Sequence, residues 1–232
     1  MPLKDYESLV ASTAGIVTVA SFFAPAFICK KVIQKGNTDN IDPMPFIGGM
    51  CMSVLMFQHG VILKDPAMIP VNIFGFLLNL IYFSIFYHYS KERMQLWTSL
   101  GKGAAIVAVL IGYAQLEHEA NIEFRFGLIT TAIMFSLVSA PLLSLGEIVR
   151  TKNSASLPFP LIVSTLCVTS LWLLYGFILE NIFIQFQNAV TFLLCLVQLA
   201  LCFIYPAIDD PKDAAKKERV INQSEIYMFL IF

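Results

Sequence analysis

Charged side chains are scarce in this chain. Of its 232 residues, 13% are Asp, Glu, Lys or Arg, whereas a soluble domain carries about 25%. Hydrophobic residues make up 57%, and the mean hydropathy is +0.73. This composition argues against a soluble domain and indicates an integral membrane protein, surrounded by a lipid bilayer. The net charge of −1 gives no reason to expect a nucleic-acid partner.

Ionisable groups are also missing from most of the long apolar runs. Residues 8–29, 45–63, 67–88, 159–179 and 182–205 contain no Asp, Glu, Lys or Arg. Carriers coupled to protons or ions place carboxylates or His chains inside the membrane. Their absence favours passive, uncoupled transport of a neutral solute, and it leaves no acid–base pair for catalysis. We therefore expect no enzyme activity and no cofactor.

The cysteines suggest no metal site either. They lie in or beside apolar runs without metal-binding spacing, so we interpret them as small packing residues. The five are Cys29, Cys51, Cys167, Cys195 and Cys202.

The apolar runs predict seven transmembrane helices. About 20 apolar residues cross a bilayer as a helix, and breaks at charges, prolines and glycines separate the runs. The fourth is short and the least regular. The predicted spans are 8–29, 45–63, 67–88, 103–116, 126–149, 159–179 and 182–205.

The same motif skeleton occurs twice, 116 residues apart. The matched pairs are Pro25 and Pro141, Gly60 and Gly176, Asn72 and Asn188, and Tyr89 and Tyr205. A parallel duplication of hydrophobic segments is typical of a transporter with its site between the halves. The fourth span lies outside the duplication. One extra crossing allows the second set of three helices to enter the membrane in the same orientation as the first.

The predicted fold is an all-α membrane protein with a 3+1+3 arrangement of seven transmembrane helices. Its parts are an extracellular N-terminus (1–7), a first three-helix repeat (8–90), a linker helix with its loops (91–124), a second repeat (125–206) and a cytoplasmic tail (207–232). An extracellular or lumenal N-terminus places twelve of the fifteen Lys and Arg residues on the cytoplasmic side. We expect the plasma membrane, with Golgi or another endomembrane as the alternative. The oligomeric state stays open, a homo-oligomer included.

Two asparagines and one tryptophan are the polar groups expected mid-membrane. Asn72 and Asn188 each follow a repeated glycine by twelve residues, and a buried amide suits sugar hydroxyls because it offers both donors and acceptors. The alternative is a structural interhelical hydrogen bond. Trp172 lies one helical turn before Gly176, where its indole face could stack on a pyranose. An interfacial aromatic position is the alternative for Trp172.

Four prolines lie toward the cytoplasmic ends of their helices. Pro25 and Pro141 interrupt long apolar runs, and proline kinks a helix by removing an amide donor. Together with Pro45 and Pro158 they would form a ring of hinges. Pro45 and Pro158 also fit the alternative of simple N-terminal helix starters.

Several motifs together resemble the second repeat of the eukaryotic SWEET sugar transporters, and the first half resembles the first repeat more loosely. The similarity covers roughly residues 8–206. The motifs are Ser139-Ala140-Pro141, Arg150-Thr151-Lys152-Asn153-Ser154, Leu157-Pro158-Phe159, Trp172-Leu173-Leu174-Tyr175-Gly176, Asn188 and Tyr205-Pro206.

The resemblance implies two parallel three-helix bundles and facilitated, bidirectional diffusion of a sugar by alternating access. A monosaccharide such as glucose is expected. The implied substrate-binding residues are Asn72, Asn188, Trp172, Met56, Val168, Ser21, Thr18, Leu137 and Met134. The implied hinge is Pro25, Pro45, Pro141 and Pro158, and the implied outer gate is His59, Tyr175 and Asn181.

The chain departs from the family pattern at several of these positions. His59 stands where an aromatic residue is common, Asn181 replaces an acid, and Gln187 replaces the usual proline before Asn188. Met56 is larger than the usual small residue, which favours a small sugar. The alternatives are a carrier of another small solute such as an amino acid, and a seven-helix receptor, which should lack the repeat.

Overall fold

In the computed structural model, residues 2–39, 41–155, 157 and 159–207 are described, without the side chains of residues 2, 3, 137–144 and 147. Every regular element in these ranges is a helix, as predicted. The elements are η1 (Pro2–Tyr6), α1 (Glu7–Ser21), α2 (Ala26–Lys35), α3 (Met44–Leu63), α4 (Met68–Tyr89), α5 (Arg93–Leu116), α6 (Glu119–Thr151), α7 (Phe159–Ile178) and α8 (Ile182–Ile204). All but residue 207 of the predicted tail lies outside the described residues.

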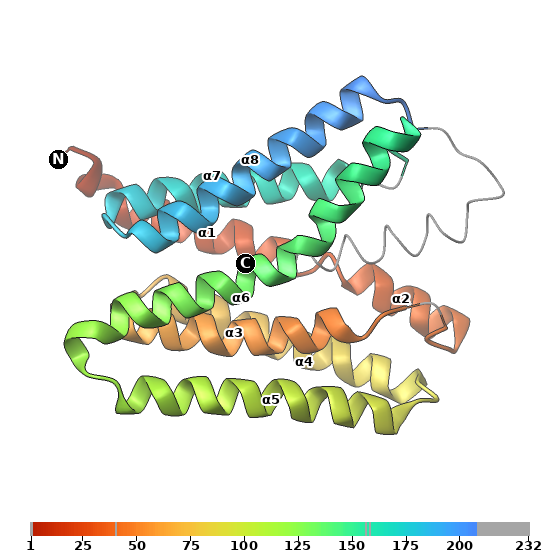
Figure 1. Cartoon of the computed structure of the whole chain (residues 1–232), viewed down its shortest axis with the longest axis horizontal. Helices are drawn as coiled ribbons and strands as arrows, with labels where there is room; N and C mark the ends of the chain where they lie inside the picture. Colours follow the sequence, from red (N-terminus) through yellow and green to blue (C-terminus); the bar gives the residue numbers. More distant parts are fainter. Residues whose placement is uncertain (1, 40, 156, 158, 208–232) are drawn as a thin grey trace.

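Among the described residues, six segments are long and apolar enough to cross a membrane by length and composition, and one of them contains both α1 and α2. In Figure 1, α7 and α8 lie beside α1, whereas α3, α4 and α5 form a second group, and α6 extends along both. Helix α1 packs against α7, and α6 packs against both α3 and α8. The two halves therefore contact each other through repeat-related helix pairs, α1 with α7 and α6 with α3.

The turns that follow α3 and α7 show that the duplication extends to backbone geometry. Lys64 and Glu180 both adopt a left-handed conformation, with φ of 56° and 57°. The next residue in each turn, Asp65 or Asn181, donates its backbone N–H to the carbonyl of Gly60 (2.9 Å) or Gly176 (3.1 Å). Because this bond satisfies an unpaired carbonyl at the end of a helix, both helices end in the same way.

The side chains of Asp65 and Asn181 then begin the next helix in each half. Asp65 Oδ1 accepts from the backbone N–H groups of Ala67 and Met68, and Asn181 Oδ1 accepts from those of Phe183 and Ile184. Asn181 is the N-cap of α8, and Asp65 caps the turn directly before α4 in the same manner; both satisfy otherwise unpaired donors. Repeat-related residues therefore fix where α4 and α8 start.

The repeated glycines are explained by close helix packing beside these turns. A Cβ atom added to Gly60 would lie 3.0 Å from Cβ of Met68, and one added to Gly176 would lie 3.0 Å from the backbone nitrogen of Gln185. Small residues permit such close approach of membrane helices. Any larger residue would push α3 away from α4, or α7 away from α8.

The proline positions differ between the halves. The first predicted span is broken between Ser21 and Ala26, with Pro25 at the N-cap of α2. In contrast, α6 continues through position 141 without a break, so Pro141 does not end the helix. A proline removes one ladder hydrogen bond but permits a bent helix to continue, and α6 changes direction along its length (Figure 1).

The other two prolines stand near helix starts. Pro45 is the second residue of α3, where a missing N–H costs nothing. Pro158 lies outside the described residues, directly before the start of α7 at Phe159.

The linker helix α5 is longer than the predicted span 103–116. It begins at Arg93 and has 24 residues. Lys102 marked the predicted start, yet its side chain is exposed, and a long lysine stem can extend toward the membrane surface without ending a helix. The predicted span therefore begins later than the observed helix, because the prediction treated the charged Lys102 as a helix boundary.

A small polar network joins the end of α5 to α6. Tyr113 Oη and Arg125 Nη1 donate to Glu117 Oε2 at 2.5 and 2.7 Å, and the backbone N–H of His118 donates to Oε1 at 3.0 Å. The Tyr113 hydroxyl, followed by the His118 amide and Arg125, lowers the pKa of Glu117 to about 2. Glu117 is therefore ionised at any physiological pH.

Candidate functional site

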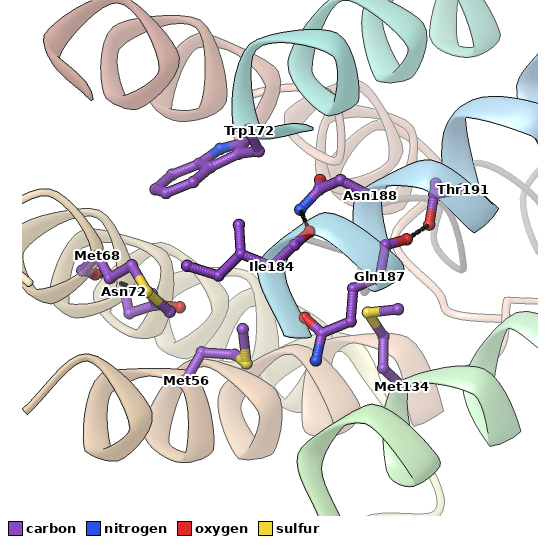
Figure 2. A pocket seen from close by; sticks show the side chains of 9 residues that line it. All are labelled: Met56, Met68, Asn72, Met134, Trp172, Ile184, Gln187, Asn188 and Thr191. Carbon is purple, nitrogen blue, oxygen red and sulfur yellow. Dashed lines mark hydrogen bonds between the residues drawn. The ribbon is translucent and has the colours of Figure 1, made fainter. Parts of the chain in front are cut away.

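A cavity lies between the two halves, lined by residues from both. Helices α3 and α4 contribute from the first half, and α6, α7 and α8 from the second (Figure 2). Its volume is about 40 Å³, which is room for about three water molecules. The lining residues are Met56, Met68, Asn72, Met134, Trp172, Ile184, Gln187, Asn188 and Thr191.

The repeated asparagines are held in the same way in both halves. Nδ2 of Asn72 donates to the carbonyl of Met68 at 2.8 Å, and Nδ2 of Asn188 donates to that of Ile184 at 2.8 Å. Each bond connects the amide to its own helix, one turn earlier. Among the described residues, neither side-chain carbonyl oxygen accepts a hydrogen bond, and both oxygens keep some accessible surface. The cavity therefore has two repeat-related acceptors.

Trp172 forms one wall of the cavity and joins the halves. Its Nε1 donates to Oγ1 of Thr18 on α1 at 2.8 Å, and its ring meets that of Tyr175 edge-on at 5.6 Å. Trp172 is 8% exposed and lies six residues before the end of α7 at Ile178. Because the indole N–H is already bonded to Thr18, the ring offers its apolar surface to the cavity.

The structure brings together five of the nine residues expected to bind substrate, namely Asn72, Asn188, Trp172, Met56 and Met134. Thr18 and Val168 are fully buried and support Trp172 from behind. Ser21 lies almost one turn further along α1 and donates to the Thr18 carbonyl, and it does not line the cavity. The side chain of Leu137 lies outside the described residues.

One hydrogen bond joins the halves at the outer end, by which we mean the end where α3 and α7 finish. Tyr175 Oη donates to Oδ1 of the buried Asp65 at 3.0 Å. The apolar cluster around this bond also contains residues of both halves, including Ala14, Met68, Val168 and Ile184. The two halves are therefore joined at the outer end.

The other two expected gate residues have different surroundings. His59 is fully buried against Phe126 and Phe183 of the second half, and neither of its ring nitrogens has a hydrogen-bond partner among the described residues. Asn181 caps α8 and donates to Glu123 Oε1 of α6 at 3.5 Å, so these contacts do not reach the first half.

The comparisons with known proteins agree with this geometry. Residues 8–94 and 124–209 match the family described as sugar efflux transporter for intercellular exchange. The chain is 35% identical over 212 residues to a protein of Drosophila pseudoobscura pseudoobscura named sugar transporter SWEET1, covering 89% of this chain and 92% of the relative. The chain belongs to the SWEET family.

Other SWEET proteins are more distant but cover the chain as fully. The mouse sugar transporter SWEET1 is 27% identical, with 89% of this chain and 94% of the relative covered. A solved structure of a eukaryotic SWEET transporter superimposes with a TM-score of 0.79 at 22% identity, covering 88% of this chain and 98% of that one. This likeness confirms the predicted fold.

Sequence reasoning missed several residues of this SWEET site. Ile184, Gln187 and Thr191 lie on the same face of α8 as Asn188, and Met68 lies one turn before Asn72, so helical spacing from the asparagines would have found them. Asp65 stands 116 residues before Asn181. The acid expected at Asn181 therefore occupies the repeat-related position in the first half.

The opposite end of the molecule, where α3 and α7 begin, differs from the outer end. There the apolar cluster around Phe46, Phe83 and Phe86 belongs to the first half, and the cluster around Ile148, Ile162 and Leu201 belongs to the second. Among the described side chains, the SWEET chain is thus joined across its halves at the outer end, while the two halves have separate apolar clusters at the other end.

Proposed function

We propose that this protein carries a monosaccharide such as glucose across a membrane, passively and in both directions. The observation that carries the proposal is the composition of the cavity. Amide acceptors from both halves and one indole face surround a space that no ionised side chain lines among the described residues. A neutral, hydroxyl-rich solute suits these groups, and the relatives named above are called sugar transporters.

A sugar ring has polar hydroxyls and an apolar C–H face, which match the amide groups and the apolar side chains that line the cavity. Its hydroxyls can donate to the free carbonyl oxygens of Asn72 and Asn188, and its C–H face can lie on the apolar surface of Trp172. Three methionines, Met56, Met68 and Met134, complete the lining. Their flexible side chains can adapt to a small ligand.

The small volume supports alternating access and a small substrate. A cavity of about 40 Å³ is below the roughly 300–1,000 Å³ of ligand pockets. A sugar therefore enters only when the halves separate, and a disaccharide needs a larger separation than a monosaccharide. The joined outer end and the separate apolar clusters at the other end favour entry from the cytoplasmic side in this conformation.

The four prolines are the proposed hinge for that separation, with Pro25 the best placed because the chain already breaks between α1 and α2. We propose the same orientation as predicted, N-terminus outside and C-terminus in the cytoplasm, in the plasma membrane. His59, Tyr175 and Asn181 form the proposed outer gate, together with Asp65.

The substrate class is tested by uptake into proteoliposomes that contain the purified protein. Radiolabelled glucose should enter protein-containing vesicles faster than empty ones, and excess unlabelled glucose should compete. Radiolabelled leucine should show no difference between the two. If leucine enters and glucose does not, the protein is an amino-acid carrier and the sugar proposal is wrong.

A further inference from the structure

The two halves differ at one repeat-related contact beside the cavity. In the first half Val71 of α4 packs on Gly15 of α1, with its Cγ2 only 3.3 Å from where a Cβ on Gly15 would stand. The residues 116 positions later are Gln187 and Thr131. Their contact is polar, since Nε2 of Gln187 donates to Oγ1 of Thr131 at 2.6 Å. An apolar pair in one half is thus a hydrogen-bonded pair in the other.

The direction of the Gln187 amide follows from the bonds of Thr131. The Thr131 hydroxyl donates its proton to the carbonyl of Gly127 at 2.6 Å, so toward Gln187 it can only accept. The NH₂ group of Gln187 must therefore face Thr131, and the carbonyl oxygen must face away from it. Figure 2 shows this oxygen turned toward the space that Asn72 borders from the other side.

The carbonyl oxygen of Gln187 is available to a ligand. Among the described residues, this oxygen accepts no hydrogen bond. It keeps some accessible surface, although the residue as a whole is only 4% exposed. A purely structural bridge between α8 and α6 uses only the NH₂ group. It gives no reason for a fixed, unpaired acceptor beside Asn188.

We propose that Gln187 orients the sugar in the cavity by accepting a hydrogen bond from one particular hydroxyl, and that Thr131 is its positioning residue. Asn72 and Asn188 are related by the repeat, so alone they offer two similar acceptors to a ligand that has no such symmetry. A third acceptor present in only one half selects one orientation. This inference rests on the proposed transport of a monosaccharide.

The test combines the substitution Gln187→Met with a series of glucose analogues, each lacking one hydroxyl. Methionine keeps the side-chain length and removes the acceptor. Inhibition constants against radiolabelled glucose counterflow are measured in proteoliposomes. These constants do not depend on how much active protein each preparation contains. Gln198→Met is the matched control, because Gln198 is a buried glutamine of the same helix that does not line the cavity.

For glucose, we expect Gln187→Met to raise the inhibition constant roughly tenfold, the cost of an unpaired polar group in a desolvated site. In the unaltered protein, the deoxy analogue that lacks the bonded hydroxyl should have an inhibition constant higher than that of glucose by a similar factor. In Gln187→Met, the inhibition constant of that analogue should not rise further. Gln198→Met should leave every constant unchanged. The assignment would be overturned if Gln187→Met raised the inhibition constants of glucose and of every analogue by the same factor. It would also be overturned if Gln187→Met changed none of the constants.

Thr131 supplies an independent readout of positioning. Thr131→Ser keeps the acceptor for the Gln187 amide and should retain the selectivity among analogues. Thr131→Val removes it and should reduce that selectivity. Equal selectivity in both variants would contradict the positioning role. If the unaltered protein transports no glucose at all, the proposed function itself fails; if it does and Gln187→Met behaves normally, only this inference fails.

Discussion

At the scale of single residues, the paired amides are the groups most directly tied to substrate. Asn72→Ala and Asn188→Ala should each weaken apparent glucose affinity about ten- to a hundredfold, because removing an amide partner in a desolvated site costs roughly 1–3 kcal/mol. Inhibition of counterflow in proteoliposomes measures this. Both variants should still reach the membrane, since each amide bonds only to its own helix.

Asn79→Ala is the control for this pair. Asn79 lies about two turns beyond Asn72 on α4, and its Nδ2 bonds to the carbonyl four residues earlier in the same way. It does not line the cavity, so its loss should leave affinity unchanged. Normal transport by both Asn72→Ala and Asn188→Ala would show that the amides are structural.

The Tyr175 hydroxyl is the second residue-scale test, because its bond to Asp65 joins the halves at the outer end. Tyr175→Phe should increase the outward-open population roughly three- to tenfold, the equivalent of one net hydrogen bond. The measurement is labelling of a cysteine introduced at the buried Ala14 by a membrane-impermeant thiol reagent, compared with the background from the native cysteines.

Tyr82→Phe is the matched variant for that measurement. Tyr82 is also a buried tyrosine with one hydrogen bond, from Oη to the carbonyl of Phe22 at 2.9 Å, but both residues belong to the first half. It should not change the labelling of Ala14→Cys. Equal labelling in the Tyr175→Phe and unaltered proteins would mean that the Asp65 bond does not hold the gate closed.

At the scale of helices, the break between α1 and α2 should control the conformational change. Pro25→Ala restores a backbone donor and favours one continuous helix. Flux should then fall much more than equilibrium glucose binding, provided that the trapped state keeps its site accessible. Binding in detergent and flux in liposomes, on the same protein, measure the two. Equal loss of both in a folded variant would mean that Pro25 shapes the pocket.

Helix positions and the repeat were predictable from the sequence because they depend on local patterns. The apolar runs form helices in the structure, and the repeated glycines and asparagines occupy equivalent positions in the two halves. The 116-residue offset also relates the left-handed residues Lys64 and Glu180. The continuity of α6 at position 141 was not predictable, since a proline permits either a break or a bend. Which one occurs depends on packing against other helices.

The missed site residues have a related explanation. Asp65 and Gln187 gain their roles from Tyr175 and Thr131, which lie 110 and 56 residues away in the chain. The first contact depends on how the two halves pack, and the second on how α8 packs against α6. A sequence pattern within one helix does not contain that information.

At the scale of the whole molecule, we propose a passive carrier. Five spans carry no Asp, Glu, Lys or Arg, and neutral side chains line the cavity among the described residues, so no carboxylate in these spans or in the cavity lining could couple a proton or ion to the sugar. Transport should therefore follow the sugar gradient alone. The joined outer end and the separate apolar clusters at the other end would then belong to one of two alternating states.

Counterflow of radiolabelled glucose in proteoliposomes, with and without a protonophore, tests this claim most directly. Vesicles preloaded with unlabelled glucose should accumulate labelled glucose transiently, because a carrier exchanges one for the other. The accumulation should be the same when the protonophore abolishes any proton gradient. Accumulation that disappears with the protonophore would contradict passive transport, since it would require a group that couples proton movement to sugar movement.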